Sequence, residues 1–106
     1  MRLAMSNAIV INTNHSVDIS RAYRLSERLL LKEDGVDLLA FDPDSLSVHQ
    51  LNSSMARIAR LCQQSASCEE MVIDFVETYG LEYKEAAGTV LQALQVLDQH
   101  EMIVSE

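Results

Sequence analysis

The side chains best suited to chemistry in this sequence are three histidines and two cysteines. His15, His49 and His100 lie far apart, without a second ligand close to any of them. Cys62 and Cys68 fall on what we predict to be successive helices, and one pair of cysteines without clustered histidines makes neither a disulfide framework nor a zinc site. We therefore interpret both cysteines as small buried hydrophobic residues, and the sequence predicts no bound metal.

Motifs for catalysis or nucleotide binding are missing as well. Gly35, Gly80 and Gly88 are isolated, so the chain has no glycine-rich loop to hold a phosphate. His49 alternates with Leu51 on a predicted strand, where a packed, hydrogen-bonded histidine is the commoner explanation. The carboxylates fit solvated helix faces better than an acid and base pair, and neither cysteine lies in a nucleophile motif. The sequence predicts a protein that is not an enzyme and uses no cofactor.

Charge is distributed unevenly along the 106 residues. Residues 1–60 carry seven basic and seven acidic side chains, whereas residues 61–106 carry one lysine and nine carboxylates, so the net charge of −8 lies in the C-terminal part. A region of this kind repels phosphate. We therefore expect no nucleic-acid partner.

The composition is typical of a single folded domain. Hydrophobic residues make up 48% of the chain, which is enough for one modest core. No apolar run approaches the ~20 residues that cross a bilayer, and Met1–Met5 is followed by polar residues rather than by the core of a signal peptide. We expect a cytoplasmic protein that makes no contact with a membrane.

The centre of the predicted fold is the stretch from Asp37 to Cys62, in which the hydrophobic period changes. Leu38–Phe41 and Leu46–Leu51 fit short extended runs, and the residues between them favour a turn. After Asn52 the apolar residues recur at helical spacing, and the Asn52 side chain can accept from the free N–H groups of a new helix. A strand therefore passes into a helix, which we place over residues 53–62.

One further strand is predicted before this stretch. Arg28–Glu33 fits a strand, and Asp34-Gly35 is the tightest turn signal in the chain, leading into a second strand over Val36–Phe41. Three short antiparallel strands result.

Two more helices are predicted after it, beyond a connection over residues 63–66. Ser67 and Glu70 have the spacing of a capping box, which begins a helix that ends at Gly80. A third helix spans about 83–99, and residues 102–104 are a candidate for a short terminal strand. The predicted fold class is α+β, a three-stranded antiparallel sheet followed by three helices.

Residues 1–22 are interpreted as an N-terminal extension of a domain that spans 23–106. Within the extension, Ala8–Ile11 is a short run rich in β-branched residues, which favour strands. The run could add an edge strand, exchange between subunits or belong to a tail.

The third predicted helix is the most informative element for function. Its apolar residues cover an arc of roughly 220°, wider than one core contact requires. One flank consists of small residues, Ala86, Thr89, Ala93 and Val96, which would leave a shallow apolar trough beside a strand. Packing of this trough on the protein's own sheet or on another subunit, and binding of a ligand in it, are equal alternatives.

The order of elements resembles the PqqD-like family, the small winged-helix-like peptide chaperones also called RiPP recognition elements. The resemblance covers about Leu29–Val104, and it is carried by Leu38–Asp42, His49–Asn52, Ile58, Leu61-Cys62, Ser67, Val90–Leu94 and Met102-Ile103. One departure is the connection after the first helix, where family members often have Asp-Gly and this chain has Gln63-Gln64-Ser65.

The resemblance implies a binding function without chemistry. Such modules bind the leader segment of a ribosomally made precursor peptide and present it to a modifying enzyme, often a radical S-adenosylmethionine enzyme. The leader adds as a strand to the edge of the third strand and rests against the third helix, a mode in which main-chain bonds give affinity and side-chain pockets give selectivity. Carried onto this sequence, the peptide-binding residues are Ser47, Val48, His49, Gln50, Leu51, Ala86, Thr89, Ala93 and Val96.

Two alternatives belong to other functional classes. A winged-helix transcription regulator has similar parts, but the exposed face of the third helix would offer glutamines and carboxylates rather than the basic residues that bind phosphates. The other alternative is a structural module that forms a homodimer through its N-terminal strand.

Deletion of residues 1–14 tests the interpretation of the extension. If Ile9–Ile11 is a strand, the deletion should lower the melting temperature or change the mass in solution, because a paired or exchanged strand would be lost. Thermal unfolding and sedimentation measure the two effects. A deletion variant with the parent's melting temperature and mass would identify the segment as a tail.

Overall fold

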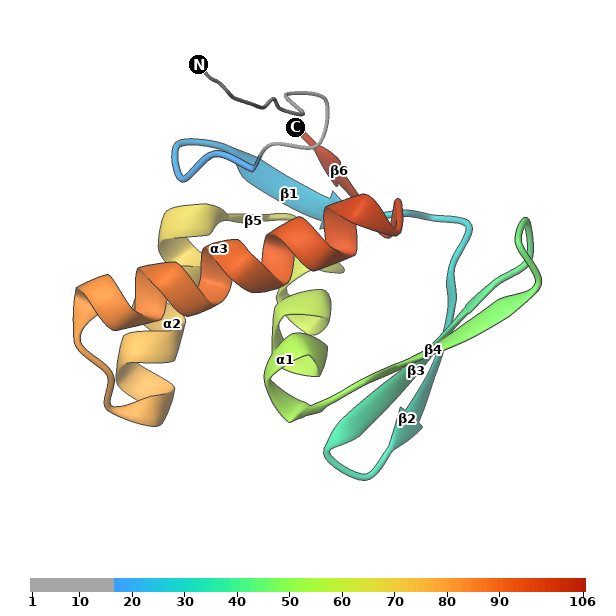
Figure 1. The fold of residues 1–106 in the computed structure, drawn as a ribbon, viewed down its shortest axis with the longest axis horizontal. Helices are drawn as coiled ribbons and strands as arrows, with labels where there is room; N and C mark the ends of the chain where they lie inside the picture. Colours follow the sequence, from blue (N-terminus) through green and yellow to red (C-terminus); the bar gives the residue numbers. More distant parts are fainter. Residues whose placement is uncertain (1–16) are drawn as a thin grey trace, which may run out of the picture.

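The computed structural model describes residues 17–106, which form six strands and three helices. In chain order they are β1 (Ala22–Leu25), β2 (Leu30–Asp34), β3 (Asp37–Asp42), β4 (Ser47–Leu51), α1 (Ser53–Cys62), β5 (Ala66–Ser67), α2 (Cys68–Tyr79), α3 (Tyr83–Gln99) and β6 (Ile103–Ser105). The predicted α+β class with three helices is confirmed (Figure 1). The run Ile9–Ile11 lies outside the described residues, so its role stays a prediction.

Strands β2, β3 and β4 form the predicted antiparallel meander. The β2–β3 turn places Gly35 at a φ of 65°, a left-handed conformation that glycine adopts without the steric cost of a side chain. Between β3 and β4 the Asp42 carboxylate accepts a hydrogen bond from the backbone N–H of Asp44 (3.0 Å), which closes the turn around Pro43. Local sequence therefore determines both turns of the meander.

The helix ends are those predicted from capping residues. The Asn52 side chain accepts from the backbone N–H of Met55 (3.1 Å) and begins α1. Ser67 and Glu70 form a reciprocal capping box at the start of α2. Gly80 ends α2 with a φ of 66°.

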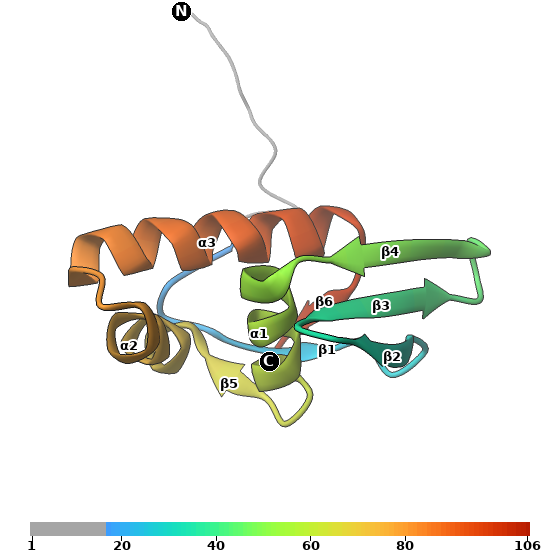
Figure 2. The ribbon, with the colours of Figure 1, turned by 90° about the horizontal axis from the view of Figure 1, so that it is seen from below.

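Helix α1 lies at the centre of the molecule. It sits between α2 and the meander, with α3 running across it (Figures 1 and 2). Four of its residues, Ala56, Ile58, Ala59 and Cys62, are fully buried, so neighbours cover it on more than one side. Burial of a side chain the size of Ile58 contributes about 1.5–3 kcal/mol relative to exposure. The fold is therefore assembled around α1.

A second antiparallel sheet, with strand order β5-β1-β6, was not predicted apart from the terminal strand. Tyr23 of β1 is buried and pairs with Ala66 on one side and Ser105 on the other. Strands of two to four residues carry too little periodicity to be recognised, and the partners of β1 are distant in sequence. The predicted boundary after residue 22 falls inside β1.

The Gln63-Gln64-Ser65 connection reaches a left-handed backbone conformation without a glycine. Ser65 has a φ of 64°, in the left-handed region that glycine usually occupies. Its backbone N–H donates to the carbonyl of Cys62 (3.2 Å), which continues the last turn of α1. The loop therefore turns sharply enough for β5 to follow directly.

The last residue of α2 is partly open to solvent. Tyr79 has the helical spacing of a core residue, but it is 44% exposed, and its ring meets that of Phe75 in an edge-to-face arrangement. Among residues 17–106, no helix is both long and apolar enough to cross a membrane.

Candidate functional site

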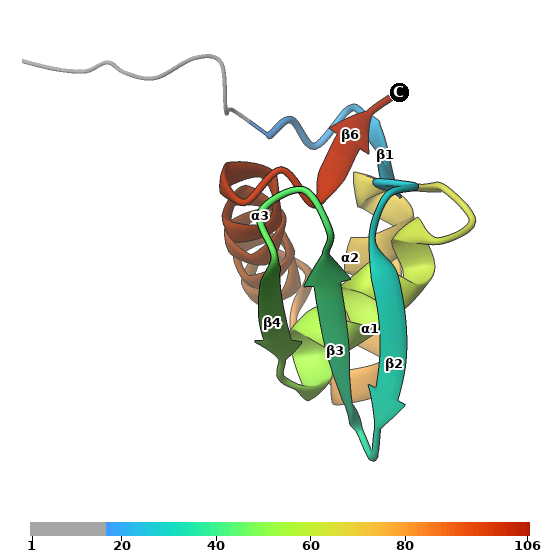
Figure 3. The same cartoon turned by 90° about the vertical axis from the view of Figure 1, so that its right-hand side faces the viewer.

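Strand β4 leaves one edge of the meander open. It pairs with β3 along one side, and within residues 17–106 no strand pairs with its other side. Figure 3 shows β4 as an outer strand of the meander, with α3 behind it. Unpaired backbone N–H and C=O groups along such an edge can accept another strand.

A cavity of about 300 Å³ lies between this edge and α3. Leu51, Leu97 and Met102 are buried in its wall, whereas Val48 and Val96 are exposed at its rim. The complete lining is Val48, His49, Gln50, Leu51, Met55, Val96, Leu97, His100 and Met102. The arrangement combines a backbone edge with a pocket that offers apolar side chains, the two features that strand addition uses.

Side chains along β4 alternate between the two faces of the meander. His49 pairs with Ala40 and Leu51 pairs with Leu38, both buried, so this set faces the core. Val48 and Gln50 occupy the opposite face, where the Gln50 amide donates to the Asp37 carboxylate (3.2 Å).

Two histidine rings meet at the cavity. The ring centroids of His49 on β4 and His100 after α3 are 5.1 Å apart, with the planes tilted by 51°. The His49 Nε2 atom lies 3.2 Å from the Ser47 hydroxyl, within hydrogen-bonding distance. His49 is thus packed and hydrogen-bonded, as its position on the strand indicated.

The predicted peptide-binding residues divide into two groups. Five of them line the cavity: Val48, His49, Gln50, Leu51 and Val96. The other four are outside its lining: Ser47 bonds to His49, Ala86 is fully buried, Thr89 is exposed, and Ala93 is half-buried against the core. Ala86 precedes Val96 by nearly three helical turns, about 15 Å along the axis at the usual rise.

Sequence reasoning missed four lining residues: Met55, Leu97, His100 and Met102. Leu97 and His100 follow Ala93 at i+4 and i+7, so the helical period of the proposed flank continues into them. Met102 follows the helix, where the period ends, and Met55 belongs to another helix. The positions of these last two residues depend on tertiary packing.

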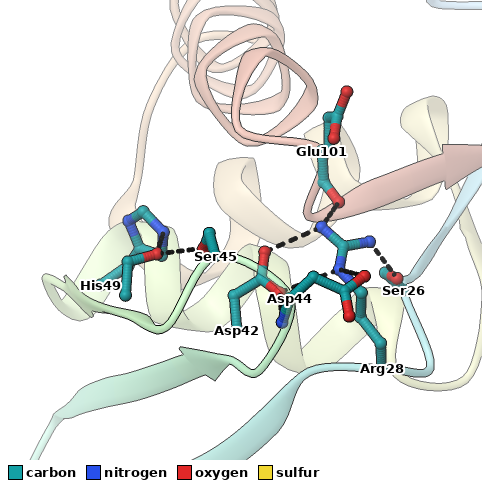
Figure 4. Close-up of polar contacts among 8 residues, drawn as sticks. Ser26, Arg28, Asp42, Asp44, Ser45, His49 and Glu101 are labelled. Atoms are coloured by element: carbon teal, nitrogen blue, oxygen red, sulfur yellow. Dashed lines mark hydrogen bonds and ion pairs between the residues drawn. The ribbon is translucent and has the colours of Figure 1, made fainter.

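An ion pair lies where β3 turns into β4, next to the turn after α3 (Figure 4). The Arg28 guanidinium donates from Nε and Nη2 to the two oxygens of Asp42, at 3.1 and 3.0 Å. These hydrogen bonds, with help from the N–H of Asp44, lower the pKa of Asp42 from 3.8 to about 2, although burial opposes the shift. Asp42 therefore stays ionised across the physiological range.

The cysteines show no sign of reactivity. Cys62 and Cys68 are both buried and unbonded. Burial raises the pKa of the Cys62 thiol to about 12, which disfavours the reactive thiolate. In the described part of the chain, no three residues among His, Cys, Asp and Glu come together as a metal site would require.

Comparison with known proteins now identifies the family. The family model described as coenzyme PQQ synthesis protein D (PqqD) matches residues 37–103. The chain belongs to the PqqD family. The match starts at β3 and ends at the first residue of β6, and it confirms the resemblance seen in the sequence.

Two solved structures share this PqqD-family fold. One is described as TbiB1 in complex with the TbiA(beta) leader peptide, with a TM-score of 0.71, 15% identity, and coverage of 76% of this chain and 93% of that chain. The other is described as lasso peptide synthetase B1 complexed with the leader peptide, with a TM-score of 0.69, 18% identity, and coverage of 77% and 96%. At these identities the likeness concerns the fold. No curated protein matches the sequence.

Replacement of Asp42 by asparagine should change the acid stability of the protein. Because the pKa of Asp42 is lower in the folded state, its contribution to the free energy of unfolding is present above about pH 4 and is lost as the pH falls towards 2. Asp42→Asn should therefore lower the melting temperature at neutral pH, and the gap to the parent should narrow between pH 4 and 2. Circular dichroism at a series of pH values measures both.

The control for this experiment is Asp44→Asn. Asp44 is 79% exposed and lies 3.6 Å from the Arg28 guanidinium, so its removal should have little effect at any pH. A gap between parent and Asp42→Asn that stays constant down to pH 2 would contradict the role given to this carboxylate.

Proposed function

We propose that this PqqD-family protein binds the leader segment of a ribosomally synthesised precursor peptide and presents it to a modifying enzyme. The observation that carries the proposal is the open edge of β4 beside a cavity against α3 with buried apolar residues in its wall. The descriptions of both similar structures name a bound leader peptide, and this supports the proposal. In this function the protein contributes binding and no catalysis.

The leader pairs with β4 as a fourth strand of the meander. Alternate leader side chains then enter the cavity, where Leu51, Leu97 and Met102 offer apolar contacts. The remaining side chains point away from the cavity and are free to vary. Affinity from main-chain bonds combined with selectivity from a few apolar residues suits a module that recognises a leader and leaves the rest of the precursor accessible.

The modifying enzyme is the second partner in this proposal. Membership of the PqqD family favours a radical S-adenosylmethionine enzyme, because such enzymes often work with these modules. We place the protein in the cytoplasm, where precursor peptides are made. The transcription-regulator alternative finds no support in α3, whose exposed residues after Lys84 include Glu85 and glutamines but neither lysine nor arginine.

Titration with synthetic peptides is the first test. The peptides cover the N-terminal segments encoded by any short open reading frames next to this gene, and isothermal calorimetry measures their affinity for the parent protein. We expect one of them to bind, and a scrambled peptide of the same composition not to bind. Failure of every leader segment to bind would overturn the proposed function.

Backbone N-methylation of the bound peptide tests strand addition without any change to the protein. A strand on β4 directs every second N–H towards the edge, and a methyl group there removes one ladder hydrogen bond and adds a clash. Affinity should fall on the order of tenfold at alternate positions and stay close to the parent value between them. Sensitivity with a period of three to four residues would instead indicate a bound helix.

Substitution of Val96 by arginine tests the cavity. Val96 lies at the cavity rim and is 38% exposed, so Val96→Arg places a long charged chain at the entrance while keeping a good helix former. Binding of the leader peptide should fall at least tenfold. The matched control is Gln92→Arg, an exposed α3 position outside this cavity that receives the same charge.

Circular dichroism establishes that both arginine variants are folded. If Val96→Arg folds and binds the peptide as tightly as Gln92→Arg does, the leader does not occupy this cavity.

A further inference from the structure

One arginine side chain holds three chain segments together. Arg28 lies between β1 and β2, and its Nε and Nη2 donate to the Asp42 carboxylate. Nη1 donates to the Ser26 hydroxyl (2.9 Å), and Nη2 also donates to the backbone carbonyl of Glu101 (2.9 Å). Figure 4 shows the guanidinium between these partners. A single planar group therefore connects β3, the β1–β2 connection and the turn after α3.

Two of these partners lie next to opposite walls of the cavity. Asp42 is the last residue of β3 and pairs with Ser47, the first residue of β4, so a bond to Asp42 fixes the start of the open edge. Glu101 lies between His100 and Met102, which both line the cavity on the α3 side. Arg28 thus bonds to residues next to the lining on both sides.

The turn at Glu101 is held both by its own backbone hydrogen bonds, including one from the N–H of Met102 to the carbonyl of Leu97 (2.9 Å), and by Arg28. Glu101 has a φ of 58°, a left-handed conformation that is uncommon for a residue with a side chain and is retained where the surroundings stabilise it. The N–H of Glu101 donates to the carbonyl of Asp98 (2.9 Å), and the Arg28 guanidinium binds its carbonyl. The position of His100 and Met102 therefore depends in part on Arg28.

We infer that Arg28 is a positioning residue that sets the separation of β4 and the C-terminal turn of α3, and with it the width of the leader-binding cleft. The effect of this width on leader binding rests on the proposed function, because the width matters only if a strand enters the cleft. The geometric part of the inference, the separation of the walls, stands independently of any ligand.

The guanidinium shape is essential to this role. Arginine presents five N–H donors in a rigid plane, so it can bind a carboxylate with two nitrogens and still reach a carbonyl and a hydroxyl. Lysine keeps the charge but has one ammonium group at the end of a flexible chain. Arg28→Lys should therefore preserve the attraction to Asp42 while losing the link between the two walls.

The experiment compares Arg28→Lys with a matched control. Arg57→Lys removes a similar fork, in which Arg57 Nη2 and Nε bind the Asp74 carboxylate at 2.8 and 2.5 Å and join α1 to α2. Arg57 is outside the lining of the cavity. Both variants should lose thermal stability, so stability alone does not separate a positioning role from a structural one.

The first measurement needs no ligand. Proton nuclear Overhauser effects between the rings of His49 and His100, whose centroids are 5.1 Å apart in the parent, report on the wall separation. We expect these signals to weaken or disappear in Arg28→Lys and to persist in Arg57→Lys. Parent-like signals in a folded Arg28→Lys would overturn the inference.

The second measurement is calorimetric titration with the synthetic leader peptide that binds the parent, at a temperature where circular dichroism shows every variant to be folded. The affinity should fall at least tenfold for Arg28→Lys and change less than twofold for Arg57→Lys. Equal affinities for Arg28→Lys and the parent would overturn the inference while leaving the proposed function in place. If no peptide binds the parent, the proposed function fails and the ring signals still decide the geometric part.

A second variant covers the case in which Arg28→Lys does not fold. Asp42→Asn keeps the shape of the partner and one acceptor oxygen, so it loosens the bridge from the β3 side alone. Asp42→Asn should weaken the ring signals and lower the peptide affinity, as Arg28→Lys does. Parent-like values for both measurements in this variant would likewise overturn the inference.

Discussion

Burial of α1 on several sides is the constraint on which the rest of the structure depends. The two small sheets belong to separate hydrogen-bonded ladders, β5-β1-β6 and β2-β3-β4, so backbone pairing does not hold them together. Both contact α1, directly through β1, β3 and β4, and α3 packs on the same helix. Small side chains at Ala56 and Ala59 allow these elements to approach closely. The relative placement of sheet and helix, and hence the cavity between β4 and α3, follows from this shared core.

An open strand edge is a liability that many proteins suppress, because it can pair with another chain. Here the edge is five residues long and lies beside a cavity with buried Leu51 and Leu97 in its wall. A ligand strand at this position would satisfy backbone groups and cover apolar surface in one event. Unpaired backbone groups and apolar surface favour unwanted pairing when the edge stays exposed. The same two features make the edge suitable for binding a peptide.

Charge supports this view of the molecule. Three arginines in the described residues bind carboxylates with two nitrogens each: Arg28 with Asp42, Arg57 with Asp74, and Arg60 with Glu33. These basic groups are therefore engaged in joining elements, while the chain as a whole carries a net charge of −8. A net negative charge favours cationic ligands over anionic ones, and salt screens this effect where the charges are exposed.

The sequence by itself determined the elements whose signals are local. The change of period at Asn52, the Ser67–Glu70 box and the turn glycines predicted α1, α2 and the meander, because caps and turns satisfy backbone groups within a few residues. It also indicated Val48–Leu51 and Val96 as neighbours of one site, through the family resemblance and the helical period. Only tertiary structure decided the second sheet, since β1 pairs with residues more than forty positions away along the chain. Tertiary structure likewise brought Met55 and Met102 to the cavity. It also brought Arg28 to Asp42 and Glu101, because separate elements meet there and no local pattern in the sequence records such a meeting.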